Sequence, residues 1–269
     1  MNLTASLIVH NELTRYLYWT LPALMEFCDT VVVMDDHSDD GTYEWLEELA
    51  EGEYQHRLWL SRYEGDRMFT GEGVARQELL ERTLLASPTH ILAIDADEFI
   101  ADGEQLRQIA SGHLKSRSPG ELAAWKISME EIWDVTAVAM WCRCDGGWRP
   151  HGVPALYSVP DVMTVDYRIR SDQLACGRVP QAVERLALRR GAGETGTEIL
   201  HLGWANPGER AARYARYVEA DGGRFHASTH LKSIMWDRSR QSRGARDWPE
   251  ALAPYKQDLL EFINGREAS

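Results

Sequence analysis

Three short polar segments contain the side chains whose types and spacing suit the binding of a metal ion and a phosphate group. They begin at His10, Asp35 and Asp95, and each directly follows an apolar run. Carboxylates as close in sequence as Asp95 and Asp97 repel each other when they face one site, and a divalent cation relieves that repulsion. Oxygen ligands favour Mg²⁺ or Mn²⁺, and substrate phosphates usually complete the coordination shell of such an ion. The segments therefore predict a metal–diphosphate site.

The apolar runs before these segments have the length of buried β-strands. We expect strands at Ala5–Val9, Thr30–Met34 and His90–Ile94, separated by helical patterns that include Thr42–Glu51 and Val74–Leu85. This alternation is typical of a parallel sheet, in which ligands bind beyond the carboxyl ends of the strands. If the three strands are neighbours, the three polar segments lie at one edge. A lone Asp-x-Asp is also common in turns and helix caps, so the prediction depends on all three segments.

The pattern changes after about residue 105. Apolar and polar residues alternate over 123–129 and 135–141, which predicts half-exposed antiparallel strands. Beyond them we expect a strand at Glu198–Gly203 and helices at Pro207–Ala220 and Pro249–Ile263. The arginine-rich stretch Arg238–Arg246 predicts a solvated loop.

Composition excludes several classes of protein. The chain has 269 residues, of which 44% are hydrophobic, and a net charge of −13. The acidic excess lies in residues 1–105, which contain 22 acidic and 6 basic side chains. Such acidity disfavours binding to nucleic acid, although a bound cation can reverse the local field. No apolar run approaches the roughly 20 residues of a membrane helix, and the opening is too short for a signal peptide. We therefore expect a cytoplasmic protein without a transmembrane segment. The four cysteines are too few and too scattered in the sequence for a disulfide framework.

Three motifs in this order resemble the opening of the family 2 glycosyltransferases with the GT-A (nucleotide-diphospho-sugar transferase) fold. They are SLIVHNE, VVVMDDHSDDGT and ILAIDADEF. Gly73–Arg76 is also similar to the family's Gly-x-x-x-Ala-Arg-Asn segment, with Gln77 in place of Asn. The resemblance covers residues 5–100. It implies a Rossmann-like α/β/α architecture with a mostly parallel central sheet and a smaller antiparallel extension on the acceptor side.

The resemblance also implies a domain division and a role for each matching residue. Residues 1–205 would form the catalytic domain, with 1–100 binding the nucleotide sugar and 101–205 on the acceptor side, and residues 206–269 would form a helical extension. Asp36 would accept the imide hydrogen of uracil, and Asp95 would meet the ribose or a metal-bound water. The expected nucleotide-sugar contacts are Val9, His10, Asn11, Glu12, Asp36, Arg76, Asp95 and Ala96, and the expected Mn²⁺ or Mg²⁺ ligands are Asp97 and His201.

The later part of the chain departs from the family pattern. No clean counterpart of the Glu-Asp motif that carries the catalytic base is present. Glu130, at the end of the first alternating segment, is the first candidate for the base, followed by Glu131, Asp134 and Asp172. His201 follows an apolar strand and is equally compatible with a packed core histidine. Three tryptophans, Trp133, Trp148 and Trp204, are candidates for a sugar-binding wall or for core packing.

These inferences predict a metal-dependent glycosyltransferase that uses a nucleotide sugar, with UDP as the expected nucleotide and inversion as the family expectation. A retaining reaction stays open. The acceptor could be a glycan, a lipid-linked sugar, a small molecule or a protein, and the sequence does not indicate the oligomeric state. The alternatives are a sugar-phosphate nucleotidyltransferase, which would need a glycine-rich basic loop after the first strand, and a non-catalytic carbohydrate-binding module.

Overall fold

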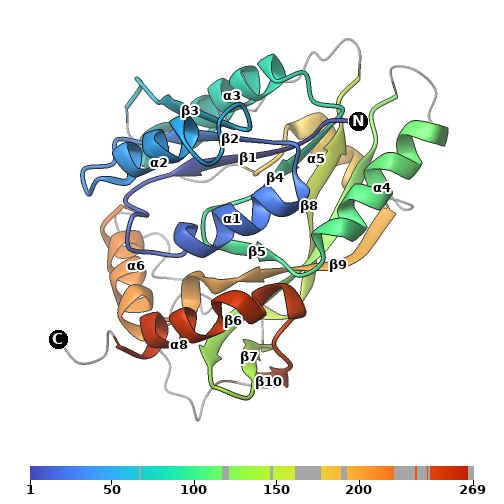
Figure 1. The fold of residues 1–269 in the computed structure, drawn as a ribbon. Coiled ribbons are helices and arrows are strands. Elements are labelled where there is room, and N and C mark those ends of the chain that lie inside the picture. Colours follow the sequence, from blue (N-terminus) through green and yellow to red (C-terminus); the bar gives the residue numbers. More distant parts are fainter. Residues whose placement is uncertain are drawn as a thin grey trace. The chain divides into compact units, whose positions relative to one another are not determined.

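The computed structural model describes the chain except for residues 67, 117–120, 146–147, 161–176, 189–192, 221–233, 235–240, 242 and 266–269. Two compact units are distinguished by their internal contacts, and each is built from separate stretches of the chain (Figure 1). The first unit comprises Met1–Ala96, Asp102–Ser128 and Gly152–Thr197, and the second comprises Asp97–Ala101, Met129–His151 and Glu198–Ser269.

The first unit contains the mostly parallel sheet that the sequence predicts. Strands β4 (His90–Ala93), β1 (Leu3–Val9), β2 (Thr30–Asp35) and β3 (Leu58–Arg62) lie side by side in that order and run parallel. Strand β8 (His151–Ser158) pairs with β4 in the antiparallel direction. Every residue of β1, β2 and β4 is buried, which explains why their sequences are continuous apolar runs. The predicted adjacency of the three strands is confirmed.

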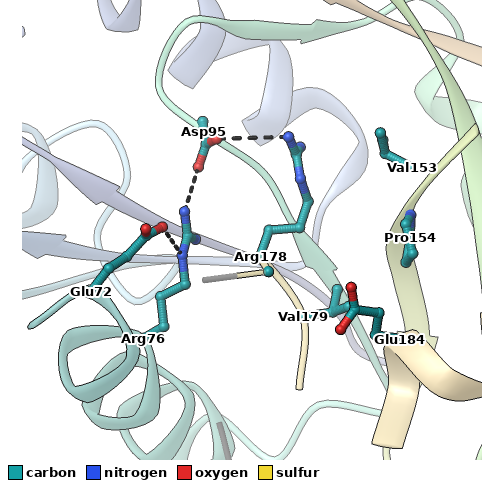
Figure 2. A pocket seen from close by; sticks show the side chains of 9 residues that line it. Glu72, Arg76, Asp95, Val153, Pro154, Arg178, Val179 and Glu184 are labelled. Atoms are coloured by element: carbon teal, nitrogen blue, oxygen red, sulfur yellow. Dashed lines mark hydrogen bonds and ion pairs between the residues drawn. The ribbon is translucent and has the colours of Figure 1, made fainter. Parts of the chain in front are cut away.

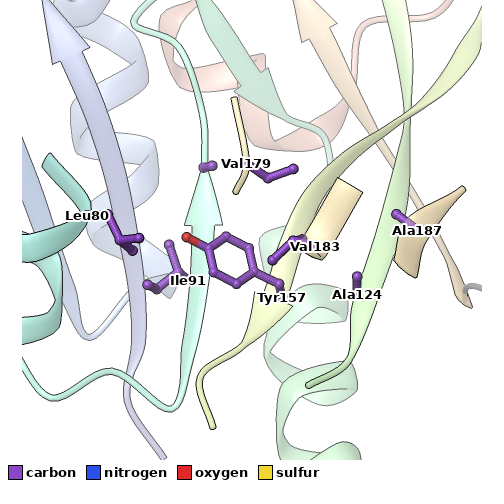
Figure 3. Packing of buried hydrophobic residues seen from close by; sticks show 8 residues of the cluster. Leu80, Ile91, Ala124, Tyr157, Val179, Val183 and Ala187 are labelled. Atoms are coloured by element: carbon purple, nitrogen blue, oxygen red, sulfur yellow. The ribbon is translucent and has the colours of Figure 1, made fainter. Parts of the chain in front are cut away.

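Helices on both faces bury this sheet (Figure 1). Helix α3 packs on β1 and β2, and α1 packs against α4. At one end of the unit, Leu80, Ile91, Tyr157 and Val183 form a single apolar cluster with side chains from α3, β4, β8 and α5 (Figure 3). The helices are α1 (Leu17–Phe27), α2 (Thr42–Glu51), α3 (Met68–Leu85), α4 (Gly103–Ser116) and α5 (Gln181–Ala187).

The second unit contains short antiparallel strands and two helices. Strand β5 (Glu98–Ile100) pairs with the end of β9 (Gly193–His201), and β7 (Met140–Arg143) pairs with the end of β6 (Ala124–Val135). The turn η2 (Leu202–Trp204) leads into α6 (Pro207–Ala220), and η6 (Glu250–Tyr255) leads into α8 (Lys256–Gly265). The bounds of α6 are those predicted from the sequence.

Two expectations about this part of the chain are wrong. Strand β6 continues to Val135, because an irregularity between Ile132 and Asp134 shifts the register and interrupts the alternation without ending the strand. Arg243–Arg246, expected within a solvated loop, forms strand β10 on β7. Its arginines are compatible with a strand because carboxylates face them: Arg243 Nη1 lies 3.4 Å from Asp134 Oδ2 and Arg246 Nη1 lies 2.8 Å from Glu198 Oε2.

Within the described residues, no helix combines the length and the apolar character needed to cross a membrane.

Candidate functional site

The segments that follow β1 and β2 are fastened to each other at the carboxyl edge of the sheet. The Asp36 amide donates to the carbonyl of Val9 (2.8 Å), and His10 Nδ1 lies 2.7 Å from the Asp36 carbonyl oxygen. The Asn11 amide donates to Ser38 Oγ (2.9 Å), and Asn11 adopts a left-handed conformation with φ of 55°. The structure thus brings together four predicted nucleotide contacts: Val9, His10, Asn11 and Asp36.

Glu12 holds the segment after β1 in place through buried polar contacts. Its amide donates to Thr42 Oγ1 (2.7 Å), and its buried carboxylate pairs with Arg15 Nη1 (2.6 Å). Asp35 is also buried, and one of its carboxylate oxygens accepts a hydrogen bond from the Ser38 amide (3.1 Å). Asp35 therefore caps the turn after β2, a role that the sequence did not distinguish from that of its neighbour.

Tyr63, which follows β3, is a further aromatic residue at this edge. Its ring makes an edge contact with His37 at a centroid distance of 6.2 Å, and its amide donates to the Asp35 carbonyl (2.9 Å). Burial, followed by the nearby carboxylates of Glu78 and Asp36, raises the pKa of the Tyr63 phenol. Sequence reasoning missed this residue.

Asp95 lies between two arginines of the first unit (Figure 2). Arg76 Nη2 is 3.2 Å from Asp95 Oδ1, and Arg178 Nη2 is 3.7 Å from Asp95 Oδ2. Arg76 also donates from Nε to Glu72 Oε1 (2.8 Å), so its guanidinium is aligned by two carboxylates. These side chains line a pocket of about 300 Å³ whose other walls are Val153, Pro154, Gly177, Val179 and Glu184.

The structure thus brings together Arg76 and Asp95, which were each predicted as nucleotide-sugar contacts, whereas Arg178 was not predicted. Arg178 is distant from Asp95 in the sequence, and no local pattern indicates that the two meet. Ala96, the next predicted contact, is buried, and its carbonyl accepts a hydrogen bond from Thr20 Oγ1 of α1 (2.7 Å). That bond fixes the backbone directly after Asp95.

In the second unit, Asp97 belongs to a closed cluster of four charged side chains. Its Oδ2 lies 3.4 Å from His201 Nε2 and also contacts Arg213 Nη2 of α6. His201 Nδ1 lies 2.6 Å from Glu131 Oε2. Two acidic and two basic groups thus face one another in a largely buried place. Two of the predicted residues, Asp97 and His201, are brought together, while Arg213 was not predicted.

The charges in this cluster stabilise one another. Burial alone would raise the pKa of Asp97, but the Arg213 guanidinium and His201 hold it well below its usual range. Burial alone would lower the pKa of His201, but Glu131 and Asp97 on its two sides raise it well above the ordinary value. The same histidine lowers the pKa of Glu131 against the effect of burial. The two carboxylates therefore favour the protonated form of His201.

The cluster has donors that fit a divalent metal ion. Asp97 offers a carboxylate, and His201 offers Nε2 once that nitrogen has lost its proton. Glu131 on Nδ1 supplies the carboxylate that typically orients a metal-ligating histidine. No group of three or more His, Cys, Asp or Glu side chains in the described part of the chain is arranged to hold an ion. Because Asp97 and His201 are only two ligands, substrate oxygens and water would have to complete the shell of an ion bound there.

The predicted bases have different surroundings. Glu130 Oε2 contacts Arg246 Nη1 and accepts a hydrogen bond from Cys142 Sγ (3.1 Å). Glu131 is engaged by His201, as described above. Asp172 lies outside the described residues.

The three tryptophans considered for a sugar-binding wall pack in the core of the second unit. Trp133, Trp148 and Trp204 are buried against one another, with ring centroids 4.9 to 5.9 Å apart. The fully buried Arg143 stacks on Trp133 at 4.6 Å and pairs with Asp145 Oδ1 at 2.8 Å. Core packing, the alternative recognised from the sequence, accounts for their positions.

No protein-family model and no curated protein matches the chain. Among solved structures, it is similar to S. aureus TarS in complex with UDP, with 22% identity over 52% of this chain and a TM-score of 0.39. It is similar to a mannosyltransferase, PcManGT from Pyrobaculum calidifontis, in complex with GDP-Man and Mn²⁺ (15% identity, 97% of this chain and 69% of that one, TM-score 0.48). It is also similar to GalNAc-T7 with UDP, GalNAc and Mn²⁺ (12% identity, 98% of this chain, TM-score 0.46). The chain spans 40% of the solved TarS chain, which comprises residues 1–349 of that protein, and 58% of the solved GalNAc-T7 chain.

Proposed function

We propose that the protein is a divalent-metal-dependent glycosyltransferase of the GT-A type, similar to family 2, which transfers a sugar from a UDP-linked donor to an acceptor hydroxyl with inversion. One observation carries this proposal. The polar segments after β1, β2 and β4 follow three adjacent parallel strands at their carboxyl ends. Ligands of open parallel sheets bind at that edge.

The first unit supplies groups suited to a nucleotide. The fastened segments after β1 and β2 present backbone and carboxylate acceptors, and we assign the uracil imide to Asp36. Asp95, whose two carboxylate oxygens face Arg76 and Arg178, is the candidate acceptor for ribose hydroxyls. Arg76 is the candidate for the diphosphate. Burial of Asp36 strengthens each hydrogen bond that it makes, because water competes less well there.

The second unit supplies the candidate metal ligands, Asp97 and His201. When bound, the cation would stabilise the negative charge that develops on the leaving diphosphate. Glu131 holds His201 in the orientation needed for Nε2 to bind. We assign Glu131 this positioning role, and the base that removes the acceptor proton is sought among Glu130 and Asp172.

Asp97→Asn tests the proposal. The amide keeps the size of the side chain but loses the charge that binds a cation, so we expect UDP binding to lose its Mn²⁺ dependence and transfer to be abolished. Isothermal titration of UDP with and without Mn²⁺, and release of UDP from UDP-sugars in the presence of candidate acceptors, are the measurements. Asp258→Asn on α8 is the matched control, since Asp258 is exposed in the same unit.

Unchanged turnover in Asp97→Asn would contradict the metal site. Sugar binding by the native protein without any nucleotide signal would instead favour a carbohydrate-binding module. Release of pyrophosphate from a sugar phosphate and a nucleoside triphosphate would favour the nucleotidyltransferase alternative.

A further inference from the structure

Arg213 is the cation that the structure places on Asp97. Its Nη2 contacts Asp97 Oδ2, and its Nη1 lies 3.4 Å from His201 Nε2. The side chains of Asp97 and Arg213 are 9% and 15% exposed, so this ion pair is well shielded from solvent. A carboxylate this buried needs a positive partner, because an uncompensated buried charge is strongly destabilising.

The position of Arg213 is built into its surroundings. The guanidinium lies over the ring of Trp204 with its central carbon 4.8 Å from the ring centroid. Gly203 leaves room for the pair, because a Cβ there would lie 2.2 Å from Asp97 Oδ2 and 2.7 Å from Arg213 Nη1. The Trp204 ring and the missing side chain at Gly203 therefore both fit the ion pair of Asp97 and Arg213.

A divalent ion at Asp97 and the guanidinium of Arg213 repel each other. At the separations allowed by one carboxylate, like charges that are shielded from water interact by several kcal/mol at an effective dielectric constant of about 20. Asp97 already has a positive partner when no metal is bound, because the Arg213 guanidinium contacts its carboxylate. An added cation must therefore displace or outweigh a positive charge that is already there.

We propose that Arg213 holds Asp97 in the absence of metal and opposes the binding of a divalent cation until an anionic donor offers Arg213 another partner. The inference rests on the proposed function, since the second partner would be the diphosphate of the nucleotide sugar. Guanidinium groups pair well with phosphate oxygens through two parallel hydrogen bonds. Arg213 thereby couples the two ligands: nucleotide strengthens metal binding, and metal strengthens nucleotide binding by the same factor.

The test compares Mn²⁺ binding by the native protein and by Arg213→Gln, measured by titration calorimetry with and without UDP. In Arg213→Gln we expect Mn²⁺ alone to bind roughly fivefold or more tightly than in the native protein. We also expect UDP to raise the Mn²⁺ affinity of this variant by a smaller factor than in the native protein. Arg149→Gln removes the same charge from an exposed position of the second unit and should leave both quantities unchanged.

Thermal unfolding provides a second readout that does not depend on activity. Arg213→Gln should unfold at a lower temperature than the native protein, and Mn²⁺ should raise its Tm more than it raises the native Tm. If the glutamine variant does not fold, Arg213→Met replaces it. Methionine removes the positive charge but keeps an unbranched side chain that packs well on the ring of Trp204, so Mn²⁺ should bind Arg213→Met more tightly than the native protein.

An equal or weaker Mn²⁺ affinity in the Arg213 variant, with UDP and Mn²⁺ still binding to the native protein, would overturn this inference and leave the proposed function standing. The absence of Mn²⁺ binding in both proteins, with UDP present as well as without it, would overturn both.

Discussion

At the scale of single residues, His201 shows how neighbouring charges decide what a side chain can do. Glu131 and Asp97 raise the pKa of its imidazole, and a carboxylate on Nδ1 is also the group that typically orients a metal-ligating histidine. The sequence indicated that a histidine after an apolar strand was either a ligand or a packed core residue. The structure shows a largely buried ring with a carboxylate on each nitrogen, and the role of His201 as a ligand stays a prediction.

Glu131→Gln separates a positioning role from a role as the base. If Glu131 orients His201, the variant should bind Mn²⁺ in the presence of UDP about tenfold more weakly, because the amide holds the imidazole less firmly. If Glu131 were the base, turnover would fall while Mn²⁺ affinity stayed the same. Calorimetry with Mn²⁺ and UDP, combined with initial rates of transfer, distinguishes the two. Glu250→Gln, at an exposed position of the same unit, is the control.

At the scale of elements, hydrophobic patterns in the sequence predicted the strands and helices whose positions depend on nearby residues. Buried parallel strands need continuous apolar runs, so β1, β2 and β4 were found close to their observed bounds, as was α6. Strand β10 was missed because its arginines are accommodated only by carboxylates far away in the sequence. Arg178 and Arg213 were missed for the same reason, since each meets its aspartate only after the chain has folded.

Helix α4 contains two glycines whose substitution should have opposite effects. At Gly103 a Cβ would lie 2.1 Å from the Phe27 ring, so Gly103→Ala should lower the free energy of unfolding by about 1–3 kcal/mol through overpacking. At Gly112 a Cβ would meet nothing within 4 Å, so Gly112→Ala should raise it by about 0.5–1 kcal/mol.

Urea denaturation at constant m-value measures both changes in stability. Similar values for the two variants would show that the close approach of α4 to Phe27 does not constrain the protein. The two variants control for each other because both replace a glycine of the same helix.

At the scale of the whole molecule, the question is whether residues 206–269 can be removed without disturbing the packing of the rest. The sequence suggested that residues 206–269 form a separate helical extension, and that division stays a prediction. In the structure these residues belong to the second compact unit, together with Asp97–Ala101 and Met129–His151. Arg210 of α6 donates to the carbonyl oxygens of Trp133 (2.7 Å) and Trp204 (2.8 Å), so α6 is tied to the core of that unit.

A chain truncated after residue 205 should therefore lose the native packing of the second unit. Its tryptophan fluorescence should shift toward that of exposed indole, since Trp133, Trp148 and Trp204 would lose their cover, and its thermal transition should broaden or split. A truncated protein with native fluorescence and an unchanged Tm would support an independent extension instead. Emission spectra and calorimetric scans of both proteins decide between these outcomes.

The left-handed residues Asn11 and His37, with φ of 55° and 58°, lie in the segments that are fastened together after β1 and β2. A surface that is already set before its ligand arrives has little conformational freedom left to lose. Such a template discriminates by rejecting shapes that do not match it, whereas a loose loop would adapt to them. If this edge binds the nucleobase as proposed, its preference among bases would depend on the rigidity of the segments after β1 and β2 as much as on their hydrogen bonds.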